Sequence, residues 1–500
     1  MRCGALACLT ACGNRTETLS SPPIPVTPAP FEIVSGANAT DTVLARLVQP
    51  LVVAVRTSTG APRSGVTVRF SAVPVSDSGR LAERAIVVAP RSTALFSGST
   101  SDTTDAQGRV SILVQLGTVA GVARVAVTGP EGQIDTARFT VRAGSPASLR
   151  MNVRDTTIYS GESFRLATTR DRFDNVSDVA PTVSMASLVE SALTVSDGVV
   201  RATGDFGRAR FLVTGAGKTD SAFVSAAPQG TIAAYDYNRY SLTIVRLNGT
   251  RAVRFPKLTL DLYMIPKAMS WQADGSKMIA TVEWISGGYG IYMIDTLGTF
   301  VPVVARQGRS ELSRARFSLD GQWLYYHAQT YTGSDQVSDI YRVHPDGSGN
   351  ELLFTSTITK SGFWRSPSPT SSPQYLFVEG YDVPTNTLMS GRLDLVTRTI
   401  TRWPVDGFGA AYSATADLVA IAPVDGRLIV MRPDGTGVRV LTTGLASTSG
   451  GNAAPSWSPD GRWLLAIHSA LGRYVVVRVS DGTTVPITIG ASYGPPAWRP

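Results

Sequence analysis

A short hairpin motif recurs through the C-terminal half of the chain, and it limits the fold more than any other feature of the sequence. Each copy consists of an aromatic residue, a tight Asp-Gly turn and a hydrophobic strand, and the clearest copies are Met269–Ala280, Ala315–Tyr326 and Pro455–Ala466. An Asp-Gly pair suits a turn that needs a positive φ. The copies follow one another about every 45 residues, which is the length of one propeller blade.

A second hairpin follows each copy, as in residues 340–347 and 475–482, so each repeat holds the four strands of one blade. The repeats are marked by six anchor residues: Trp271, Phe317, Pro369, Tyr412, Trp457 and Trp498. The last anchor has no blade after it, whereas residues 231–249 form a blade with no anchor before it. We therefore expect the strand at Trp498 to complete the first blade and to close the ring without an open edge.

The pairing of "WSPDG" at residues 457–461 with the "PDG" hairpin at residues 429–435 resembles the repeat of TolB-like propellers. This resemblance covers residues 230–500 and implies a six-bladed β-propeller closed by the C-terminal strand. Propellers of this kind are interaction platforms of the cell envelope. The amino-terminal domain of that family is absent here, so the resemblance does not extend to a role in the Tol system.

Residues 31–143 and 144–226 instead alternate apolar and polar side chains in short runs between turns, which predicts two β-sandwiches. Residues 50–72 and 104–128 resemble the invasin/intimin-type bacterial immunoglobulin-like domain. Residues 196–217 resemble the shorter immunoglobulin-like repeat of bacterial surface proteins. We therefore expect an all-β chain, with two immunoglobulin-like sandwiches that act as a stalk and a six-bladed propeller after them.

The amino terminus resembles the signal of a bacterial lipoprotein. One positive charge precedes a small apolar stretch, and Leu9–Cys12 resembles a lipobox, in which Cys12 is acylated and becomes the first mature residue. The alternative is a chance run of small residues with an inert Cys12. Residues 1–12 would then be the signal and the Pro-rich residues 13–30 an extended linker. All three cysteines lie in the first twelve residues, so the folded body holds no disulfide and no cysteine-based metal site.

The net charge of +8 comes from scattered arginines, without a basic run that would follow a phosphate backbone, and we expect no nucleic-acid partner. The sequence has no Gly-x-Ser-x-Gly elbow, phosphate loop or dinucleotide motif. Its histidines are His327, His344 and His468, whose positions do not favour a shared metal site. The recurrent aspartates fit turns, and no loop of EF-hand spacing is present. We expect no catalytic residues, no metal site and no cofactor, with Ca²⁺ as an alternative that no motif supports.

The aromatic residues fall into two groups. Those at repeat positions, such as Trp323 and Trp463, are expected to pack between strands. Trp284, Tyr289, Trp364 and Tyr381 lie outside the repeat, in what we take as inter-strand insertions, and they are candidates for a binding rim on the propeller.

We therefore expect a non-enzymatic binding or scaffold protein of the cell envelope, in the periplasm or on the outer-membrane surface and held to the outer membrane by a lipid. The propeller would bind an envelope protein, a peptide or a glycan. One alternative is a propeller enzyme of lactonase or sugar-dehydrogenase type that uses the axial channel. Another is a purely structural component of the surface.

Lipid attachment gives the first testable prediction. Metabolic labelling with a lipid probe should label the wild-type chain and not Cys12→Ser, because the thiol is the acceptor of the diacylglycerol. Cys8→Ser is the matched control and should keep the label. Label retained in Cys12→Ser would contradict the assignment.

Overall fold

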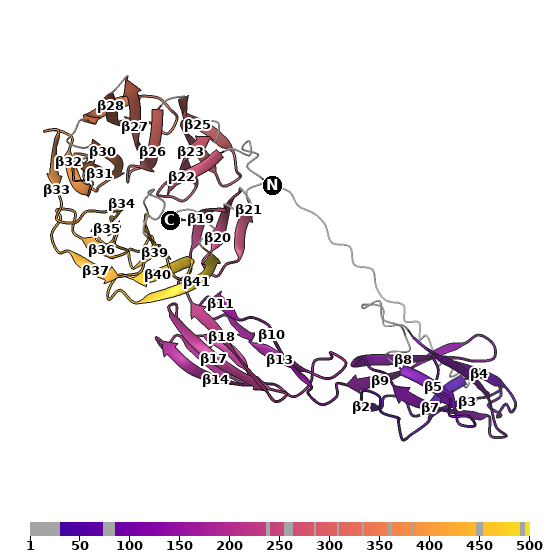
Figure 1. Cartoon of the computed structure of the whole chain (residues 1–500). Helices are drawn as coiled ribbons and strands as arrows, with labels where there is room; N and C mark the ends of the chain where they lie inside the picture. The colour runs from indigo at the N-terminus through magenta and orange to yellow at the C-terminus, as the bar shows by residue number, and fades with distance from the viewer. Residues whose placement is uncertain are drawn as a thin grey trace, which may run out of the picture. The chain divides into compact units, whose positions relative to one another are not determined.

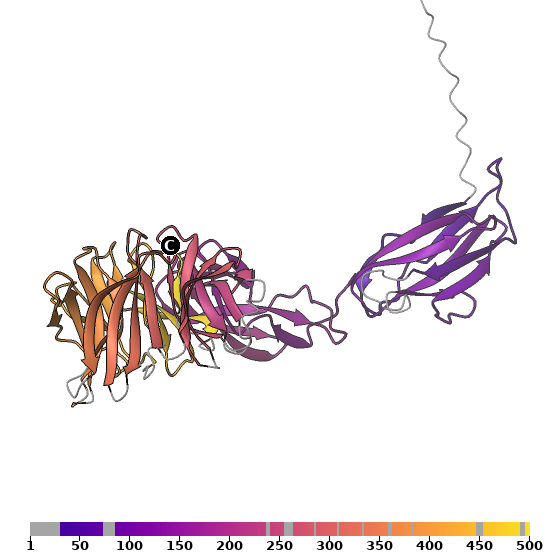
Figure 2. The ribbon, with the colours of Figure 1, turned by 90° about the horizontal axis from the view of Figure 1, so that it is seen from above.

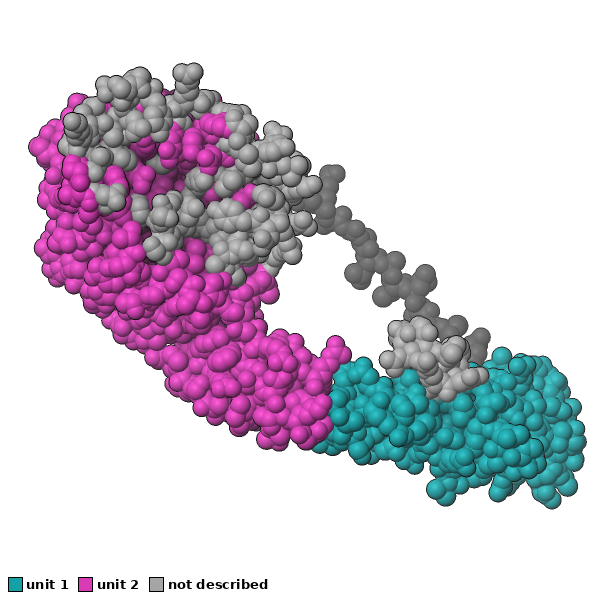
Figure 3. Space-filling view, in the orientation of Figure 1, with its two compact units in different colours: residues 1–148, 169–179 teal, residues 149–168, 180–500 magenta. Residues whose placement is uncertain are grey.

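The computed structural model describes residues 31–73, 86–236, 241–254, 264–284, 287–307, 310–332, 335–358, 363–382, 384–385, 387–446, 454–490 and 496–500. These residues form strands and turns only, so the fold is all-β (Figure 1). None of their elements is a helix that would be able to cross a membrane. The chain divides into two compact units, residues 1–148 with 169–179 and residues 149–168 with 180–500 (Figure 3). The predicted signal, linker and Cys12 lie outside the described residues.

The first unit contains a sandwich of two sheets with strand orders β1-β3-β7-β5 and β2-β9-β8-β4-β6. In β7 every second side chain is buried, and these side chains share one core with β4 and β8 of the other sheet. The period of two places one face of each sheet in the core. The strands are β1 (Phe31–Ser35), β2 (Thr40–Thr42), β3 (Leu51–Val55), β4 (Thr67–Ala72), β5 (Ile86–Pro90), β6 (Ser99–Thr103), β7 (Arg109–Leu116), β8 (Gly121–Thr128) and β9 (Ile134–Arg142).

The second unit begins with a smaller sandwich, whose sheets have the orders β11-β18-β17-β14 and β12-β16-β15. Phe211, Val213 and Val224 of the larger sheet pack against Val200 of the smaller one. The strands are β11 (Asp155–Ile158), β12 (Ser163–Arg165), β14 (Thr182–Val189), β15 (Leu193–Ser196), β16 (Val199–Ala202), β17 (Gly207–Gly215) and β18 (Lys218–Ala226). A separate two-stranded sheet pairs β10 (Ser148–Met151) with β13 (Ala167–Arg170).

The rest of the second unit forms six four-stranded antiparallel sheets in the described part of the chain, arranged around a central axis (Figures 1 and 2). We number them in chain order. The first sheet has β19 (Thr231–Asp236), β20 (Ser241–Arg246), β21 (Arg251–Arg254) and β42 (Ala497–Trp498); the second has β22 (Met264–Trp271), β23 (Lys277–Trp284), β24 (Tyr289–Asp295) and β25 (Phe300–Gln307). The third has β26 (Ser310–Phe317), β27 (Leu324–Thr332), β28 (Asp335–Val343) and β29 (Glu351–Ile358).

The remaining three sheets repeat this plan. The fourth has β30 (Phe363–Pro369), β31 (Tyr375–Asp382), β32 (Thr387–Asp394) and β33 (Thr399–Arg402). The fifth has β34 (Phe408–Ser413), β35 (Leu418–Ala422), β36 (Leu428–Met431) and β37 (Arg439–Thr442); the sixth has β38 (Ser456–Trp457), β39 (Trp463–His468), β40 (Arg473–Arg478) and β41 (Thr484–Gly490). The arrangement is propeller-like, as the repeat predicts.

The first sheet joins the two ends of this region. Trp498 pairs with Ile232 and Ala497 with Ala233, so β42 supplies the innermost strand next to β19. The Arg499 N–H also donates to the Thr231 carbonyl at 2.9 Å. The strand pairing predicted from the unmatched ends of the repeat is therefore confirmed. Trp498 is 6% exposed and packs in one cluster with side chains of the first and sixth sheets.

The smaller sandwich is joined to the sixth sheet within the same unit. Phe206 packs against Trp463 at 4.7 Å between ring centroids, and Tyr159 belongs to the same core cluster. The Thr488 N–H donates to the Thr157 hydroxyl at 3.0 Å, and Arg473 forms an ion pair with Asp155 at 2.5 Å. The predicted boundary near residue 228 therefore separates two parts of the chain that share a hydrophobic cluster.

Ring closure gives the second prediction. Trp498→Ala should lower the free energy of unfolding by about 3–5 kcal/mol, because it removes a buried indole from the strand that joins the two ends of the ring. Leu297→Ala is the control and should change stability little, since Leu297 is 79% exposed. Chemical denaturation followed by tryptophan fluorescence measures both. Equal stability of the two variants would contradict the closure.

Candidate functional site

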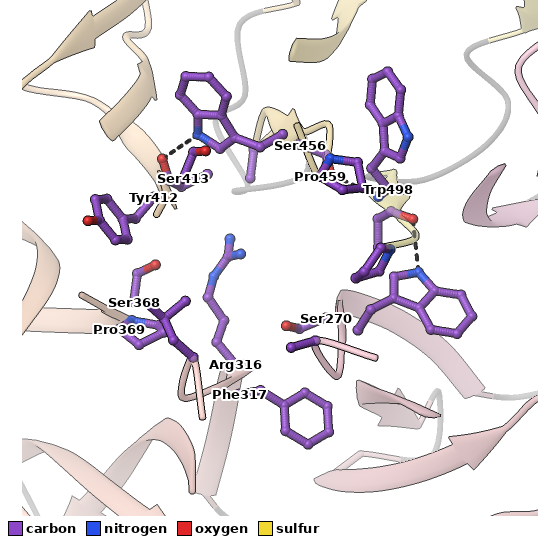
Figure 4. Close-up of a pocket in the computed structure, with 18 of the residues that line it drawn as sticks. Ser270, Arg316, Phe317, Ser368, Pro369, Tyr412, Ser413, Ser456, Pro459 and Trp498 are labelled. Carbon is purple, nitrogen blue, oxygen red and sulfur yellow. Dashed lines mark hydrogen bonds between the residues drawn. The ribbon is translucent and has the colours of Figure 1, made fainter. Parts of the chain in front are cut away.

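A cavity of about 450 Å³ lies at the axis of the six sheets, where their innermost strands end. It is lined by all six anchor residues: Trp271, Phe317, Pro369, Tyr412, Trp457 and Trp498. Figure 4 labels Phe317, Pro369, Tyr412 and Trp498 among them. This volume lies within the range of sites that bind small ligands. The anchors were predicted to be packing residues, and the structure shows that they also form the wall of one cavity.

Two of the anchors also link neighbouring sheets. The Trp271 indole N–H donates to the Ala497 carbonyl at 3.0 Å, and the Trp457 indole N–H donates to the Ala411 carbonyl at 2.8 Å. In both cases the acceptor is the residue before the anchor of the preceding sheet. The repeat therefore fixes the tryptophan rings in place, with their N–H groups already satisfied.

The residue that precedes each anchor also lines the cavity. In five sheets this residue is small: Ser270, Ser368, Ala411, Ser456 and Ala497. Small side chains fit a position where six strands converge on one axis. The third sheet departs from this pattern with Arg316, whose side chain extends into the cavity (Figure 4). Sequence analysis did not identify Arg316, although a comparison of the six positions before the anchors would have revealed it.

Arg316 carries a positive charge into this confined space. Burial, reinforced by the charge of Arg314, lowers the pKa of its guanidinium to about 10, and Glu379 partly opposes that shift. The group therefore stays protonated at neutral pH. Within the described residues, no hydrogen bond or ion pair joins the guanidinium to another side chain or to the backbone.

Arg314, two residues before Arg316, is instead neutralised. Its Nη1 lies 2.5 Å from Oε1 of Glu379, and both side chains are at least nine-tenths buried. The same Oε1 accepts the backbone N–H groups of Gly409 and Ala410 in the fifth sheet. Glu379 thus joins the third, fourth and fifth sheets through one carboxylate oxygen.

The hydrogen bond from Ala410 to Glu379 has a counterpart between the second and third sheets. The Thr281 hydroxyl of the second sheet accepts the N–H of Ala315 in the third at 3.0 Å. Ala315 and Ala410 both lie two residues before an anchor, and Thr281 and Glu379 occupy matching positions in β23 and β31. The simplest role of Glu379 is therefore structural, as an acceptor for buried N–H groups of the next sheet.

A bulge in the inner strand lies at Arg314, between residues that pair with the neighbouring strand. Pairing between β26 and β27 is interrupted between Ser313 and Arg316, and Arg314 has a φ of 42°. Ser366 and Gly409 take positive φ at the matching positions of the fourth and fifth sheets. Bulges re-aim side chains, and here Arg314 pairs with Glu379 at the cavity wall while Arg316 extends into the cavity without an ion pair in the described residues.

The three histidines have separate local roles. His327 is 1% exposed, and its Nε2 lies 2.7 Å from the Ser338 hydroxyl, which donates in turn to the Trp364 carbonyl. Since that hydroxyl has one proton, Nε2 of His327 carries the hydrogen of the first bond. His344 stacks on Trp323. His468 lies in β39, and no group of three acidic, His or Cys side chains in the described residues is placed to hold a metal ion.

The four predicted rim aromatics lie within strands, not in insertions, because the strands extend further than the hairpin motif alone indicated. Trp284 and Tyr289 lie in β23 and β24, and Trp364 and Tyr381 in β30 and β31. Their strand pairing puts all four at the ends remote from the anchors, in two sheets separated by the third. The Tyr289 hydroxyl donates to Glu283, and Trp364 packs on the core of the fourth sheet. The side chain of Trp284 lies outside the described atoms, and a binding role for this rim stays a prediction.

Six sheets around a lined axial cavity define a propeller-like all-β protein. No family model matches the sequence, and no curated protein matches it either. Solved structures with a similar fold include the periplasmic gluconolactonase of Pseudomonas aeruginosa, with a TM-score of 0.35 and 12% identity over 54% of this chain and 99% of that one.

Two further structures are similar to the chain. Oligogalacturonate lyase in complex with manganese has a TM-score of 0.30 and 13% identity, over 66% of this chain and 74% of that one. A chain of a nidogen/laminin complex has a TM-score of 0.42 and 9% identity, over 54% and 98%. These likenesses concern the fold and carry no argument about activity.

The buried histidine gives the third prediction. Burial, with a smaller effect of the Arg365 charge, lowers the pKa of His327 from 6.5 to about 3. A lowered folded-state pKa contributes stability that is present above pH 6.5 and is lost as the pH falls towards 3. From pH 7 to 4.5, the wild type should lose about 2–3 kcal/mol more than His327→Gln, measured by urea denaturation. Equal losses in the two proteins would contradict the burial of a neutral imidazole.

Proposed function

We propose that this chain is an exported, non-enzymatic binding protein of the cell envelope. Its propeller would be a six-bladed TolB-type ring that binds a protein, peptide or glycan in the axial cavity. The two sandwiches would be immunoglobulin-like domains of bacterial type that form a stalk. Cys12 would hold the protein to the outer membrane, in the periplasm or at the surface.

The observation that carries the proposal is the lining of the axial cavity. Six repeat positions that pack the sheets also face one space, and that space holds a charged side chain without a partner in the described residues. A charged group that is confined among apolar walls has lost part of its hydration, and this favours a ligand that restores its interactions. A purely structural ring would be more stable with a small residue at position 316, as in the other five sheets.

Binding is better supported than catalysis by the side chains around the cavity. Apart from Arg314 and Arg316, its polar side chains are hydroxyl groups of Ser, Thr and Tyr. Nearby Glu379 already accepts three hydrogen bonds at Oε1. General acid–base catalysis most often uses His, Asp or Glu within reach of the ligand, and the described side chains of this lining include none of the three.

Closing the cavity gives the fourth prediction. Ala414 is exposed and lines the cavity, so Ala414→Trp should obstruct it without disturbing a buried contact. Cross-linking pulldown with the full chain from envelope fractions should recover at least about tenfold less partner with this variant than with wild type. Val396→Trp, in a turn where Val396 is 76% exposed, is the matched control and should bind as wild type does.

Two outcomes of this experiment would count against the proposal. Equal recovery with Ala414→Trp and Val396→Trp would place binding outside the axial cavity. If the wild type recovers no partner, while purified protein holds Ca²⁺ or Zn²⁺ tightly and in stoichiometric amount, the lactonase or sugar-dehydrogenase alternative takes its place.

A further inference from the structure

We infer that the axial cavity recognises the carboxylate of an acidic peptide segment, and that Arg316 is the residue that pairs with it. The inference rests on the proposed function and names the ligand chemistry of the same cavity. It is drawn from the arginine side chains around the axis, the unpaired state of Arg316 in the described residues and the composition of the walls.

Several arginine side chains of the described residues gather around the axis. Arg314, Arg316 and Arg365 interact electrostatically around Glu379, and Glu311 interacts with Arg365 as a further acidic group. Glu379 lies closest to Arg314, at ion-pair distance. Among the described side chains of this group, Arg316 is a guanidinium that forms no ion pair, and an anionic ligand would supply one.

The neighbouring carboxylate of Glu379 forms its ion pair with Arg314 and none with Arg316 in the described residues. Oε1 of Glu379 binds Arg314 and two backbone N–H groups of the fifth sheet, which fixes its direction. The strand is bulged at Arg314, and both arginines line the cavity, but only Arg314 pairs with Glu379. Arg314 and Glu379 are therefore positioning residues. They leave the N–H donors of the Arg316 guanidinium available to a planar carboxylate, which a guanidinium can bind through two parallel hydrogen bonds.

The walls favour a peptide over a sugar. Several hydroxyls of the lining are already used by the fold: Ser318 and Ser458 donate to Asp320 and Asp460, and Ser413 and Ser456 accept N–H groups of Ala416 and Trp498. Much of the remaining wall is Ala, Pro, Trp and Phe, including Pro455, Pro459 and Pro496. A sugar brings many hydroxyls that would lose hydrogen bonds with water here. An Asp or Glu side chain, or a C-terminal carboxylate, brings one charge on an otherwise apolar stem.

The test uses the full chain on an array of pentapeptides with randomised flanks and Asp, Glu, Asn or Gln at the centre. Wild type should bind the acidic set at least about tenfold more strongly than the amide set, the difference expected for one buried charge-assisted pair. Arg316→Gln should lose this preference for the acidic set over the amide set, and Arg316→Lys should keep part of it. Arg427→Gln lowers the net charge equally at an exposed site outside the cavity, so it should retain the full preference.

The controls separate the inference from its rivals. An acidic preference that persists in Arg316→Gln would mean non-specific attraction by the net positive chain, and would overturn the inference. No acidic preference in wild type, or binding of tri-galacturonate but of no peptide, would overturn it as well. Melting temperatures of the Arg316 variants at or above that of wild type show that a lost preference is not lost folding. The proposed function would fail separately, by cross-linking that does not depend on Ala414.

Discussion

The pairing of β42 with β19 is the contact on which the arrangement of the second unit depends. The first sheet has four strands because it borrows one from the far end of the region, and two residues, Ala497 and Trp498, supply that strand. Their side chains and carbonyls are then used again, since Trp271 bonds to the Ala497 carbonyl and Trp498 packs between the first and sixth sheets. Closure also fixes the six anchor residues around one axis. The cavity is therefore a consequence of closing the ring.

Much of this organisation is readable from the sequence because it rests on local chemistry. Asp-Gly turns, period-two strands and aromatic anchors are short-range signals, and the unmatched ends of the repeat predict the closing strand. The shape of the inner strands is not readable in this way. The bulges at Arg314, Ser366 and Gly409 depend on contacts between sheets, and two of these three residues are not glycine, so no turn signal marks them.

The candidate site shows the same division. The anchors were identified as packing residues, and their role as the cavity wall follows only from closure. The rim aromatics Tyr289 and Trp364 were assigned to insertions because they lie outside the motif, whereas tertiary pairing extends the strands over them. The sequence motif did not single out Arg316, because scattered arginines are usually exposed on the surface of a β protein. Aligning the residues before the anchors would have marked it, as the one long charged side chain among serines and alanines.

In a ring built from repeats, residues that match the repeat pack the sheets against one another. A residue that differs from the repeat where the inner strands meet at the axis therefore needs a separate explanation. Glu379 and Thr281 illustrate a departure that packing does explain, since both accept N–H groups of the next sheet. Pro367 supports this interpretation. It occupies the position in the fourth sheet that matches Ala315 and Ala410, and proline has no N–H that needs an acceptor. His327, which matches Thr281 and Glu379 in the third sheet, is bonded to the Ser338 hydroxyl instead. No such accounting covers Arg316. A guanidinium in a confined space, with no partner among the described residues, is unfavourable for folding, so a ligand explains its presence better than the ring itself does.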